Sequence, residues 1–368
     1  MKILFITDLY PVKSDEKATP KTLLNFVKEW QKENIVDVIK PNFIFNSFVR
    51  KKPFYKSDKY NNILNINYWT PFWFDITKKF LKFNIDTDNY DLVIAHMPSG
   101  ILFADKLGKP FIAGIHNSDL EVLTNPLYCI HFKKRIIKAL NNAQKIACRS
   151  YVIKDKLLKL YPEFEEKTFV APSGIDENII CENIKNYEIL RCAQNNKTEK
   201  IKVLTCANFK KRKNIDKVIN ALKGLDGFEL TVIGDGNIRK SLEKLDKNVK
   251  FTGRLSNDKV LEYMQESDIF ILPSVSETFG MVYLEAMASG CITICTENDG
   301  ISGIIIHGKN GYLTKPDTES IRDLFIELKN TDEMVLNTIR QNSFETVKNL
   351  TSTRCADDYL QSCKLPFS

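Results

Sequence analysis

The chain has 368 residues, of which 43% are hydrophobic and 27% charged, an ordinary composition for a globular protein that gives no sign of disorder. Single cores stop growing at roughly 250 residues, so two domains are expected, and the apolar runs fall far short of the ~20 residues that span a bilayer. The net charge of +7 suits an anionic ligand, an anionic membrane surface or nucleic acid, and selects none of them. The N-terminal MKILFITDLY lacks the cleavage site of a signal peptide, which predicts a cytoplasmic protein.

The chain begins with a predicted buried strand at residues 2–7, followed by a polar loop and a helix. Thr19 and Pro20 mark the start of this helix, because threonine is a good N-cap and proline suits the first turn. A second strand is expected near residues 36–39. This alternation of strand and helix is typical of a parallel α/β sheet.

An aromatic and basic segment at residues 43–83 interrupts the alternation. In one interpretation the aromatic rings belong to the core and the lysines form a solvated face. In the other, the rings lie at headgroup depth in an anionic bilayer and the lysines meet its phosphates. The residues concerned are Trp69, Phe72, Trp73, Phe74, Lys78, Lys79, Phe80, Lys82 and Phe83.

Acidic residues and cysteines do not predict a metal site. Asp86 and Asp88 form a DTD triplet before a strand at residues 91–95, and we interpret them as turn residues. The nine cysteines show neither a CxxC pair nor zinc spacing, so we interpret them as reduced packing residues. No metal is expected.

Two histidines end predicted strands. Residues 109–116 read KPFIAGIH, a buried strand that ends in His116 and is followed by Asn117, Ser118 and Asp119. His96 ends the preceding strand, and for it we favour a structural role. Beyond residue 176 the chain is polar and unpatterned up to residue 200, which predicts a linker.

A second sheet is predicted from residue 201 onward. The first strand leads into CANFKKRKNID, which contains Lys213. A further strand at residues 228–234 is followed by Asp235 and Gly236, a strand-to-helix turn in which glycine permits tight backbone geometry.

The most informative stretch is DIFILPSVSETFGMVYLEAMASG at residues 268–290. It predicts a buried strand, a loop and then a helix that begins near Gly280. Such a loop faces the ligand crevice of an open α/β sheet, and the helix start attracts an anion. Glu277 lies in the loop and Glu285 in the helix, so the pair suits a ligand with both phosphate and hydroxyl groups, such as a nucleotide sugar.

This E-x7-E spacing, with FG after the first glutamate and EAMA around the second, resembles the retaining GT-B glycosyltransferases of family 4. The later GKNGYL resembles the same family. The resemblance implies that Glu277 holds hydroxyls of the donor hexose, that Glu285 holds the ribose, and that Lys213 neutralises the diphosphate. Asn208 stands where the family has an arginine, and Arg212 is an alternative cation. Further donor-binding positions by resemblance are Gly234, Gly236, Thr278, Phe279 and Gly280.

In the N-terminal half, HNSD resembles the family's H-x-x-D. It implies that His116 contacts the donor sugar and that Asp119 lies nearby at the cleft wall for orientation. The family has a glycine pair in the first loop, whereas this chain has residues 17–21, KATPK. Lys17 and Thr19 are the candidates there for contact with donor phosphate or acceptor.

The resemblance implies two Rossmann-like α/β domains that face each other across a cleft. Residues 1–185 would form the acceptor domain, 186–200 the linker, 201–350 the donor domain, and 351–368 a helix that packs back on the first domain. The implied activity is retaining transfer of a hexose from a nucleotide diphosphate donor, with UDP-sugars favoured, to a glycan or lipid-linked glycan in bacterial surface polysaccharide synthesis. No cofactor, metal or nucleic acid is expected.

Three alternatives remain open at this point. A nucleotide-sugar epimerase or a phosphorylase on a similar frame would bind the same groups. A non-catalytic protein that binds polyanions or membranes would explain the basic residues and leave the paired glutamates unexplained. The expected location is the cytoplasm, with the inner face of the cell membrane as a peripheral site.

Overall fold

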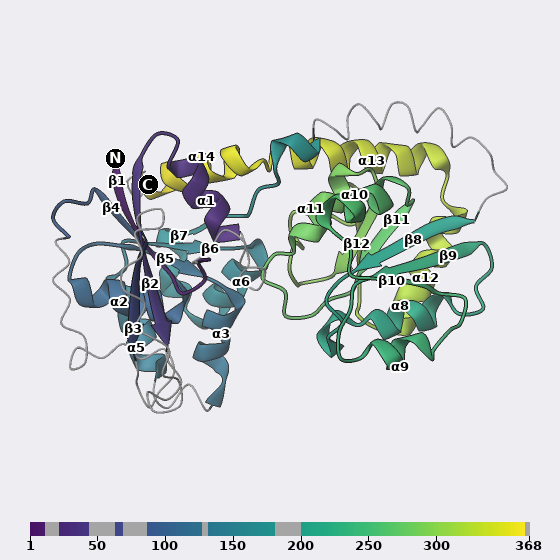
Figure 1. Cartoon of the computed structure of the whole chain (residues 1–368), viewed down its shortest axis with the longest axis horizontal. Helices are drawn as coiled ribbons and strands as arrows, with labels where there is room; N and C mark the ends of the chain where they lie inside the picture. Colours follow the sequence, from purple (N-terminus) through teal and green to yellow (C-terminus); the bar gives the residue numbers. More distant parts are fainter. Residues whose placement is uncertain (12–21, 44–62, 69–86, 127–131, 181–199, 365–368) are drawn as a thin grey trace. The chain divides into compact units, whose positions relative to one another are not determined.

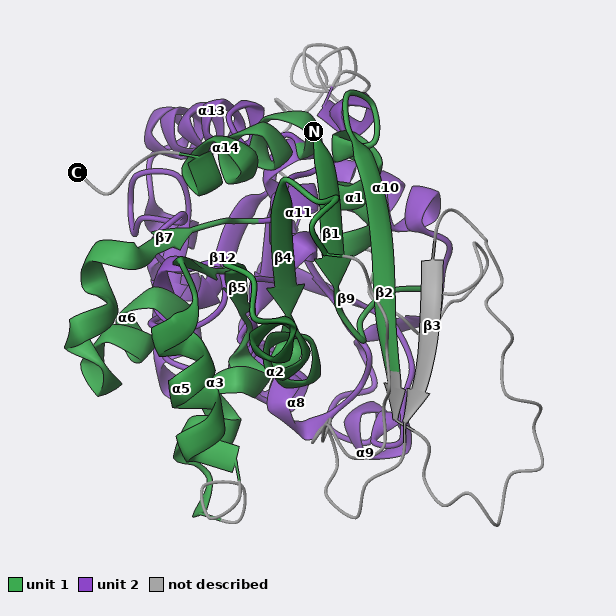
Figure 2. Cartoon of the chain, turned by 90° about the vertical axis from the view of Figure 1, so that its left-hand side faces the viewer, with its two compact units in different colours: residues 1–149, 153–172, 352–368 green, residues 150–152, 173–351 purple. Residues whose placement is uncertain are grey.

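The computed structural model describes residues 1–11, 22–43, 63–68, 87–126, 132–180 and 200–364. Contacts divide the chain into two compact units (Figure 2). Unit 1 comprises residues 1–149, 153–172 and 352–368, and unit 2 comprises residues 150–152 and 173–351. Lys17, Thr19, Asp86, residues 186–199 of the expected linker and most of the aromatic segment lie outside the described residues.

Unit 1 is built on a seven-stranded parallel sheet in the order β3-β2-β1-β4-β5-β6-β7. Its strands are β1 Lys2–Ile6, β2 Ile35–Phe43, β3 Ile63–Tyr68, β4 Leu92–His96, β5 Ile112–Ile115, β6 Lys145–Cys148 and β7 Thr168–Val170. Its helices are α1 Thr22–Trp30, α2 Met97–Leu107, α3 Asn117–Thr124, α5 Lys134–Asn142, α6 Tyr151–Leu160 and α14 Ser352–Lys364, with a 3-10 helix at Pro162–Lys167.

Unit 2 has a six-stranded parallel sheet in the order β10-β9-β8-β11-β12-β13 (Figure 1). Its strands are β8 Ile201–Cys206, β9 Phe228–Ile233, β10 Lys250–Gly253, β11 Ile269–Leu272, β12 Ile292–Thr296 and β13 Tyr312–Thr314. Its helices are α8 Ile215–Leu222, α9 Arg239–Glu243, α10 Asn257–Gln265, α11 Met281–Ala288, α12 Thr318–Asn330 and α13 Glu333–Lys348, with a 3-10 turn at Lys211–Lys213.

Both sheets reverse their strand order beside the first strand of the unit. In unit 1 the chain runs outward through β2 and β3 and returns to place β4 beside β1. In unit 2 it runs through β9 and β10 and returns to place β11 beside β8. Ligands of doubly wound sheets bind at the carboxyl ends of the strands at such a reversal. The two reversals are therefore where we look for site residues.

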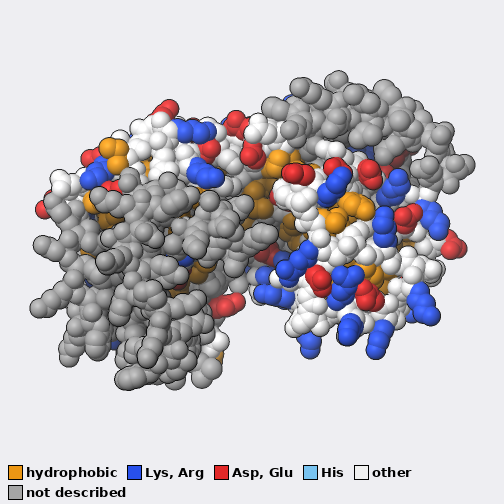
Figure 3. All heavy atoms as spheres, viewed as in Figure 1, with side chains coloured by type: hydrophobic (Ala, Val, Ile, Leu, Met, Phe, Trp, Pro, Cys, Tyr) orange, Lys and Arg blue, Asp and Glu red, His pale blue; other side chains and the backbone are white. Residues whose placement is uncertain are grey.

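The surface of unit 2 carries charges of both signs. In the face that Figure 3 shows, lysine and arginine side chains gather along the lower edge of unit 2, and aspartate and glutamate lie among them elsewhere on that face. No helix in the described part of the chain combines the length and the apolar character that crossing a bilayer requires.

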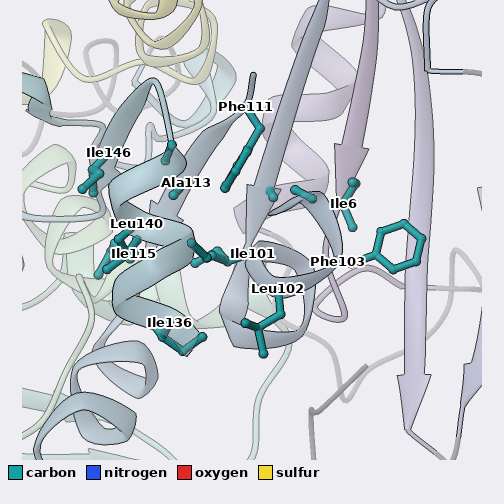
Figure 4. Close-up of a cluster of buried hydrophobic side chains, with 14 of the residues drawn as sticks. Ile6, Ile101, Leu102, Phe103, Phe111, Ala113, Ile115, Ile136, Leu140 and Ile146 are labelled. Atoms are coloured by element: carbon teal, nitrogen blue, oxygen red, sulfur yellow. The ribbon is translucent and has the colours of Figure 1, made fainter. Parts of the chain in front are cut away.

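Buried apolar side chains on both faces of each sheet pack against the helices that cover it. In unit 1, alternate residues of β1 point to opposite faces: Leu4 and Ile6 join the cluster under α2 and α5 (Figure 4), while the ring of Phe5 meets the ring of Trp30 on α1 edge-on at 5.7 Å. In unit 2, α8, α9 and α12 cover one face and α10, α11 and α13 the other (Figure 1). Strands such as β11 are buried throughout, which is why their sequences read as continuous apolar runs.

The last helix, α14, belongs to unit 1 and packs on α1. The indole Nε1–H of Trp30 donates a hydrogen bond of 2.9 Å to the carbonyl of Ala356, and the hydroxyl of Thr353 donates one of 2.8 Å to Glu29. This contact brings the end of the chain beside its first strands. Tyr359, also on α14, thereby reaches the core of unit 1.

Candidate functional site

The loop after β11 is fixed by a carboxylate from the neighbouring strand. Asp299, which follows β12, accepts hydrogen bonds of 2.7 Å from the backbone N–H groups of both Ser276 and Glu277. These bonds hold Ser276 in a left-handed conformation with φ 58°, which a residue other than glycine rarely adopts. The side chain of Glu277 is thus presented at the carboxyl end of β11 by a backbone with little freedom.

Glu277 is paired with two cations from the turn after β8. The ammonium of Lys213 forms a short ion pair with its carboxylate, Arg212 lies at 3.4 Å, and the hydroxyl of Ser274 donates to it at 3.2 Å. Burial by itself would raise the pKa of Glu277, but the charge and hydrogen bond of Lys213, followed by Arg212 and Ser274, hold the pKa below its ordinary value. Glu277 is therefore ionised at neutral pH.

The pKa of Glu285 is shifted in the opposite direction to that of Glu277. Its side chain forms no hydrogen bond or ion pair with any residue that the structure describes, and burial raises its pKa. Burial, followed by the nearby Glu285 carboxylate, also raises the pKa of the Cys206 thiol to about 12. A half-buried carboxyl group without a protein partner is available to accept hydrogen bonds from the hydroxyls of a ligand.

Helix α11 begins directly after the loop of Glu277, at the carboxyl end of β11. Gly280 has φ 90°, and a Cβ there would lie 2.5 Å from the ring of Tyr283, so the position requires glycine. No acidic residue occupies the first turn of α11, which leaves its N-terminal dipole uncompensated. Thr278 lies half-buried in the loop, whereas the ring of Phe279 is 4% exposed and belongs to the core beneath the helix.

The glycines after β9 serve close packing of two loops. A Cβ on Gly234 would lie 1.9 Å from the carbonyl of Ala207, and one on Gly236 would lie 2.4 Å from the carbonyl of Phe209. Beside them is a pocket of about 450 Å³. Its lining residues are Asn208, Phe209, Lys210, Lys211, Gly236, Asn237, Ile238 and Arg254.

At the corresponding edge of unit 1, two buried histidines face each other. Nδ1 of His96 lies 2.9 Å from Nε2 of His116, and Nε2 of His96 lies 3.0 Å from the hydroxyl of Tyr359. Burial, followed by the Arg149 guanidinium, lowers the pKa of His116 to about 3. Burial, then His116 and then Arg149, lowers the pKa of His96 well below its ordinary value. Both rings are therefore neutral at physiological pH.

Asp119 holds the backbone around His116. Its carboxylate accepts a hydrogen bond of 2.6 Å from the N–H of His116, while its second oxygen, Oδ1, has no partner among the described residues. Burial raises the pKa of Asp119 well above its ordinary value, and the neighbouring Asp8 adds to the rise. Asp8 accepts a bond of 3.0 Å from Ser99 and likewise has an Oδ1 without a described partner. The edge of unit 1 thus carries two buried carboxyl oxygens whose hydrogen-bonding capacity no described residue uses.

The structure groups the predicted residues by unit. Glu277, Lys213 and Arg212 form one cluster in unit 2, and His116 lies with Asp119 in unit 1. Asp88 is a turn residue with a side chain 98% exposed, and no group of three or more metal-ligating side chains occurs among the described residues. His96, for which we favoured a structural role, is fully buried, and its Nδ1 lies 2.9 Å from Nε2 of His116.

Sequence reasoning missed Asp299, Arg254 and Tyr359. Asp299 could have been found, because it is an acidic residue just after the strand that neighbours β11 in the sheet, where carboxyl ends align. Arg254 follows β10 in the same way. Tyr359 gave no local signal, since it lies 263 positions from His96 along the chain.

Two parallel doubly wound units, with charged and buried polar groups at their strand reversals, are the architecture of GT-B proteins. The sequence model of the glycosyl transferases group 1 matches residues 186–343, and that of glycosyltransferase family 4 matches residues 23–179. An uncharacterised glycosyltransferase of Methanocaldococcus jannaschii is 30% identical over 282 residues, 74% of each chain. The chain belongs to the family 4 glycosyltransferases with the GT-B fold, and it is an enzyme of the transferase class.

Other relatives agree with this membership. TuaC of Bacillus subtilis, a putative teichuronic acid biosynthesis glycosyltransferase, is 28% identical over 341 residues, 85% of each chain. Among solved structures, HepE of Anabaena in complex with UDP superposes with a TM-score of 0.68 over 99% of each chain, at 18% identity. At that identity the superposition establishes the fold alone.

Proposed function

We propose that this enzyme transfers a hexose from a UDP-sugar to a glycan or lipid-linked glycan, with retention at the anomeric carbon, in the synthesis of a bacterial surface polysaccharide. The observation that carries the proposal is the pairing of Glu277 with Lys213 and Arg212 in the same unit as Glu285, whose carboxyl group has no described partner. One cluster offers cations for a diphosphate, and the other carboxyl group offers an acceptor for ribose hydroxyls. HepE, whose complex contains UDP, has the same fold.

The charges in unit 2 suit the departure of a nucleoside diphosphate. In the reaction the bond between the anomeric carbon and the β-phosphate oxygen breaks, and the acceptor oxygen bonds to that carbon on the same face. The acceptor proton passes to the departing phosphate oxygen, so no separate base is required. Lys213, with Arg212 and the start of α11, stabilises the leaving group electrostatically. We expect no metal requirement, because these cations supply the neutralising charge.

Glu277 has two roles in this scheme. Its carboxylate accepts hydrogen bonds from hexose hydroxyls, and before the donor binds it holds Lys213 and Arg212 in place. The pocket beside Gly236 has the size to take a nucleobase, with a mainly apolar lining to which Asn208, Asn237 and Arg254 add polar groups. In unit 1, His116 contacts the sugar as a neutral hydrogen-bonding group, and Asp119 orients it by accepting from its backbone N–H. We expect the enzyme to work in the cytoplasm, at the inner face of the cell membrane when the acceptor is lipid-linked.

A thermal-shift panel of UDP-, GDP-, ADP- and CDP-sugars tests the donor assignment, because a ligand that binds only the native state raises Tm. We expect UDP-sugars to stabilise the wild type and to lose this effect in Glu285→Ala, with or without EDTA. Glu262→Ala is the matched control, because Glu262 is an exposed glutamate on α10 paired with Lys259. A wild type that no nucleotide sugar stabilises contradicts the proposal.

Retention at the anomeric carbon is tested by the configuration of the product. NMR of the product formed from an α-linked donor should show an α-glycoside, and a β-glycoside would contradict retention. Donor consumption without an acceptor would instead indicate an epimerase, and dependence on inorganic phosphate would indicate a phosphorylase.

A further inference from the structure

A continuous hydrogen-bonded series joins the C-terminal helix to His116. Tyr359 on α14 bonds to Nε2 of His96 at 3.0 Å, and Nδ1 of His96 bonds to Nε2 of His116 at 2.9 Å. The side chains of all three residues are buried, with His96 fully enclosed. All three belong to unit 1. The series therefore connects a residue near the end of the chain to the candidate sugar contact of the first half.

Two neutral imidazoles in direct contact must share one hydrogen. If Nδ1 of His96 carries it, Nε2 of His116 is the acceptor, and the reverse arrangement exchanges both tautomers at once. The hydroxyl of Tyr359 acts on this choice from one end of the series, and the backbone N–H of Asp119, which faces the His116 side chain at the start of α3, acts on it from the other. Among the described residues the one hydrogen-bonding partner of the Tyr359 hydroxyl is His96, so its hydrogen is satisfied only by donation to Nε2. His96 then donates from Nδ1 to His116.

The surroundings are built to hold this series. Gly114 on β5 makes room for the ring of His96, because a Cβ there would lie 2.2 Å from it. The ring of Tyr359 is enclosed edge-on by the rings of Trp30 at 5.4 Å, Phe26 at 5.6 Å and Phe169 at 5.6 Å. The aromatic contacts fix where the hydroxyl points without depending on the hydroxyl itself.

We propose that Tyr359 is a positioning residue of the transferase: through His96 it sets the ring orientation and the tautomer of His116. The inference rests on the proposed function in one respect, namely that His116 contacts the sugar. With Nε2 accepting from His96, the hydrogen of His116 is placed on Nδ1. A single tautomer presents one fixed hydrogen-bonding pattern to the substrate, which is the preorganisation that positioned groups require.

Tyr359→Phe is the first test, because it removes the hydroxyl and keeps the aromatic packing. Loss of one buried hydrogen bond corresponds to roughly a threefold to tenfold change in rate, so we expect kcat to fall by about that factor. Affinity for UDP alone should stay at the wild-type value, since the nucleotide groups lie in unit 2. Tyr90→Phe is the matched control: it loses a hydroxyl bond of 2.8 Å to Asp37 in the same unit and should keep wild-type kcat.

The tautomers can be measured without turnover. In ¹⁵N-histidine NMR spectra of the wild type, His96 and His116 should each carry hydrogen on Nδ1. In Tyr359→Phe neither tautomer of His96 satisfies Nε2, so the second tautomer of both rings should become populated. Tyr90→Phe should give the wild-type pattern.

The outcomes separate this inference from the function on which it rests. If the wild type binds no UDP-sugar, the proposed function fails, while the NMR spectra still report on the series. If Tyr359→Phe lowers Tm but leaves kcat and both tautomers unchanged, Tyr359 is a packing residue and the inference is overturned.

Discussion

The two units place opposite electrostatics at equivalent edges of similar sheets. In unit 2 the strand reversal carries ionised groups, with Glu277 between Lys213 and Arg212. In unit 1 the strand reversal carries buried groups whose charged forms are disfavoured, His96, His116 and Asp119. Two sheets of similar topology thus carry different electrostatic environments at their strand reversals. The side chains that follow the strands account for this difference.

The contrast matches two kinds of ligand chemistry. A diphosphate needs positive charge near it, and partly exposed cations supply this at modest desolvation cost. An uncharged sugar is recognised by hydrogen bonds of fixed direction, which neutral buried groups provide. Under the proposed function, unit 2 therefore binds the nucleoside diphosphate and hydroxyls of the donor sugar, and unit 1 supplies neutral contacts; the variants below test the part assigned to unit 2.

The largest expected effect comes from Lys213→Ala. If Lys213 neutralises the leaving group as proposed, its removal should lower kcat by about 10²- to 10³-fold, in the range seen when a preorganised stabilising group is lost. Lys217→Ala is the control, because Lys217 pairs with Asp216 on the solvent-facing side of α8. Turnover is measured with saturating UDP-sugar. A Lys213→Ala enzyme close to wild type would show that charge at this edge is not what drives the reaction.

Glu285→Gln should weaken the binding of UDP and at the same time stabilise the unliganded protein at alkaline pH. Loss of the charged acceptor should weaken UDP binding by roughly tenfold or more, because hydrogen bonds to charged groups are the strong ones. Burial raises the folded-state pKa of Glu285 above its unfolded value, so the protonated form favours folding and stability falls as pH rises through that interval.

Glutamine cannot ionise, so the unliganded variant should have the higher Tm at pH 8 and about the wild-type Tm at pH 4. Calorimetry at both pH values, with titration of UDP, measures these effects. Equal Tm values at pH 8 would contradict the burial of a carboxylate without a partner.

The fold and the charged half of the site could be predicted from the sequence because both leave local patterns. A strand buried on both faces reads as an unbroken apolar run, as in β11, and the spacing of Glu277 and Glu285 follows from one loop and one helix. Lys213 was assigned because the short turn that contains it resembles the corresponding turn of the family.

The contacts of unit 1 left no such pattern. Tyr359 meets His96 only because α14 returns to pack on α1, and Asp299 in unit 2 likewise fixes the loop of Glu277 from a different strand. The sequence motif also does not tell which of its side chains face the ligand: Phe279 lies between Glu277 and Glu285, yet its ring is buried in the core. Proximity in the folded chain, which periodicity does not encode, decides these cases.

Asp299→Asn tests whether the charged edge depends on its support. The carboxylate now accepts from two N–H groups, and an amide can offer its single oxygen to both only with poorer geometry. We expect kcat to fall by roughly tenfold, because Glu277 would lose its fixed direction and Lys213 its partner. Asp317→Asn, which alters the N-cap of α12 in the same unit, is the control and should keep wild-type kcat. Wild-type kcat in Asp299→Asn would mean that the loop keeps its shape without these bonds.

The smallest expected effect is that of Arg254→Ala, which tests whether the pocket beside Gly236 contributes to donor binding alone. Arg254 is an exposed residue of the pocket beside Gly236, and exposed charges contribute little in water. We expect about threefold weaker UDP binding, a smaller difference at high salt, and unchanged kcat, because the nucleobase end of the donor does not change charge in the reaction. Isothermal titration at two salt concentrations, with Lys250→Ala at the start of β10 as the control, gives the comparison. A fall in kcat instead would move the reacting phosphate toward this pocket and away from Lys213.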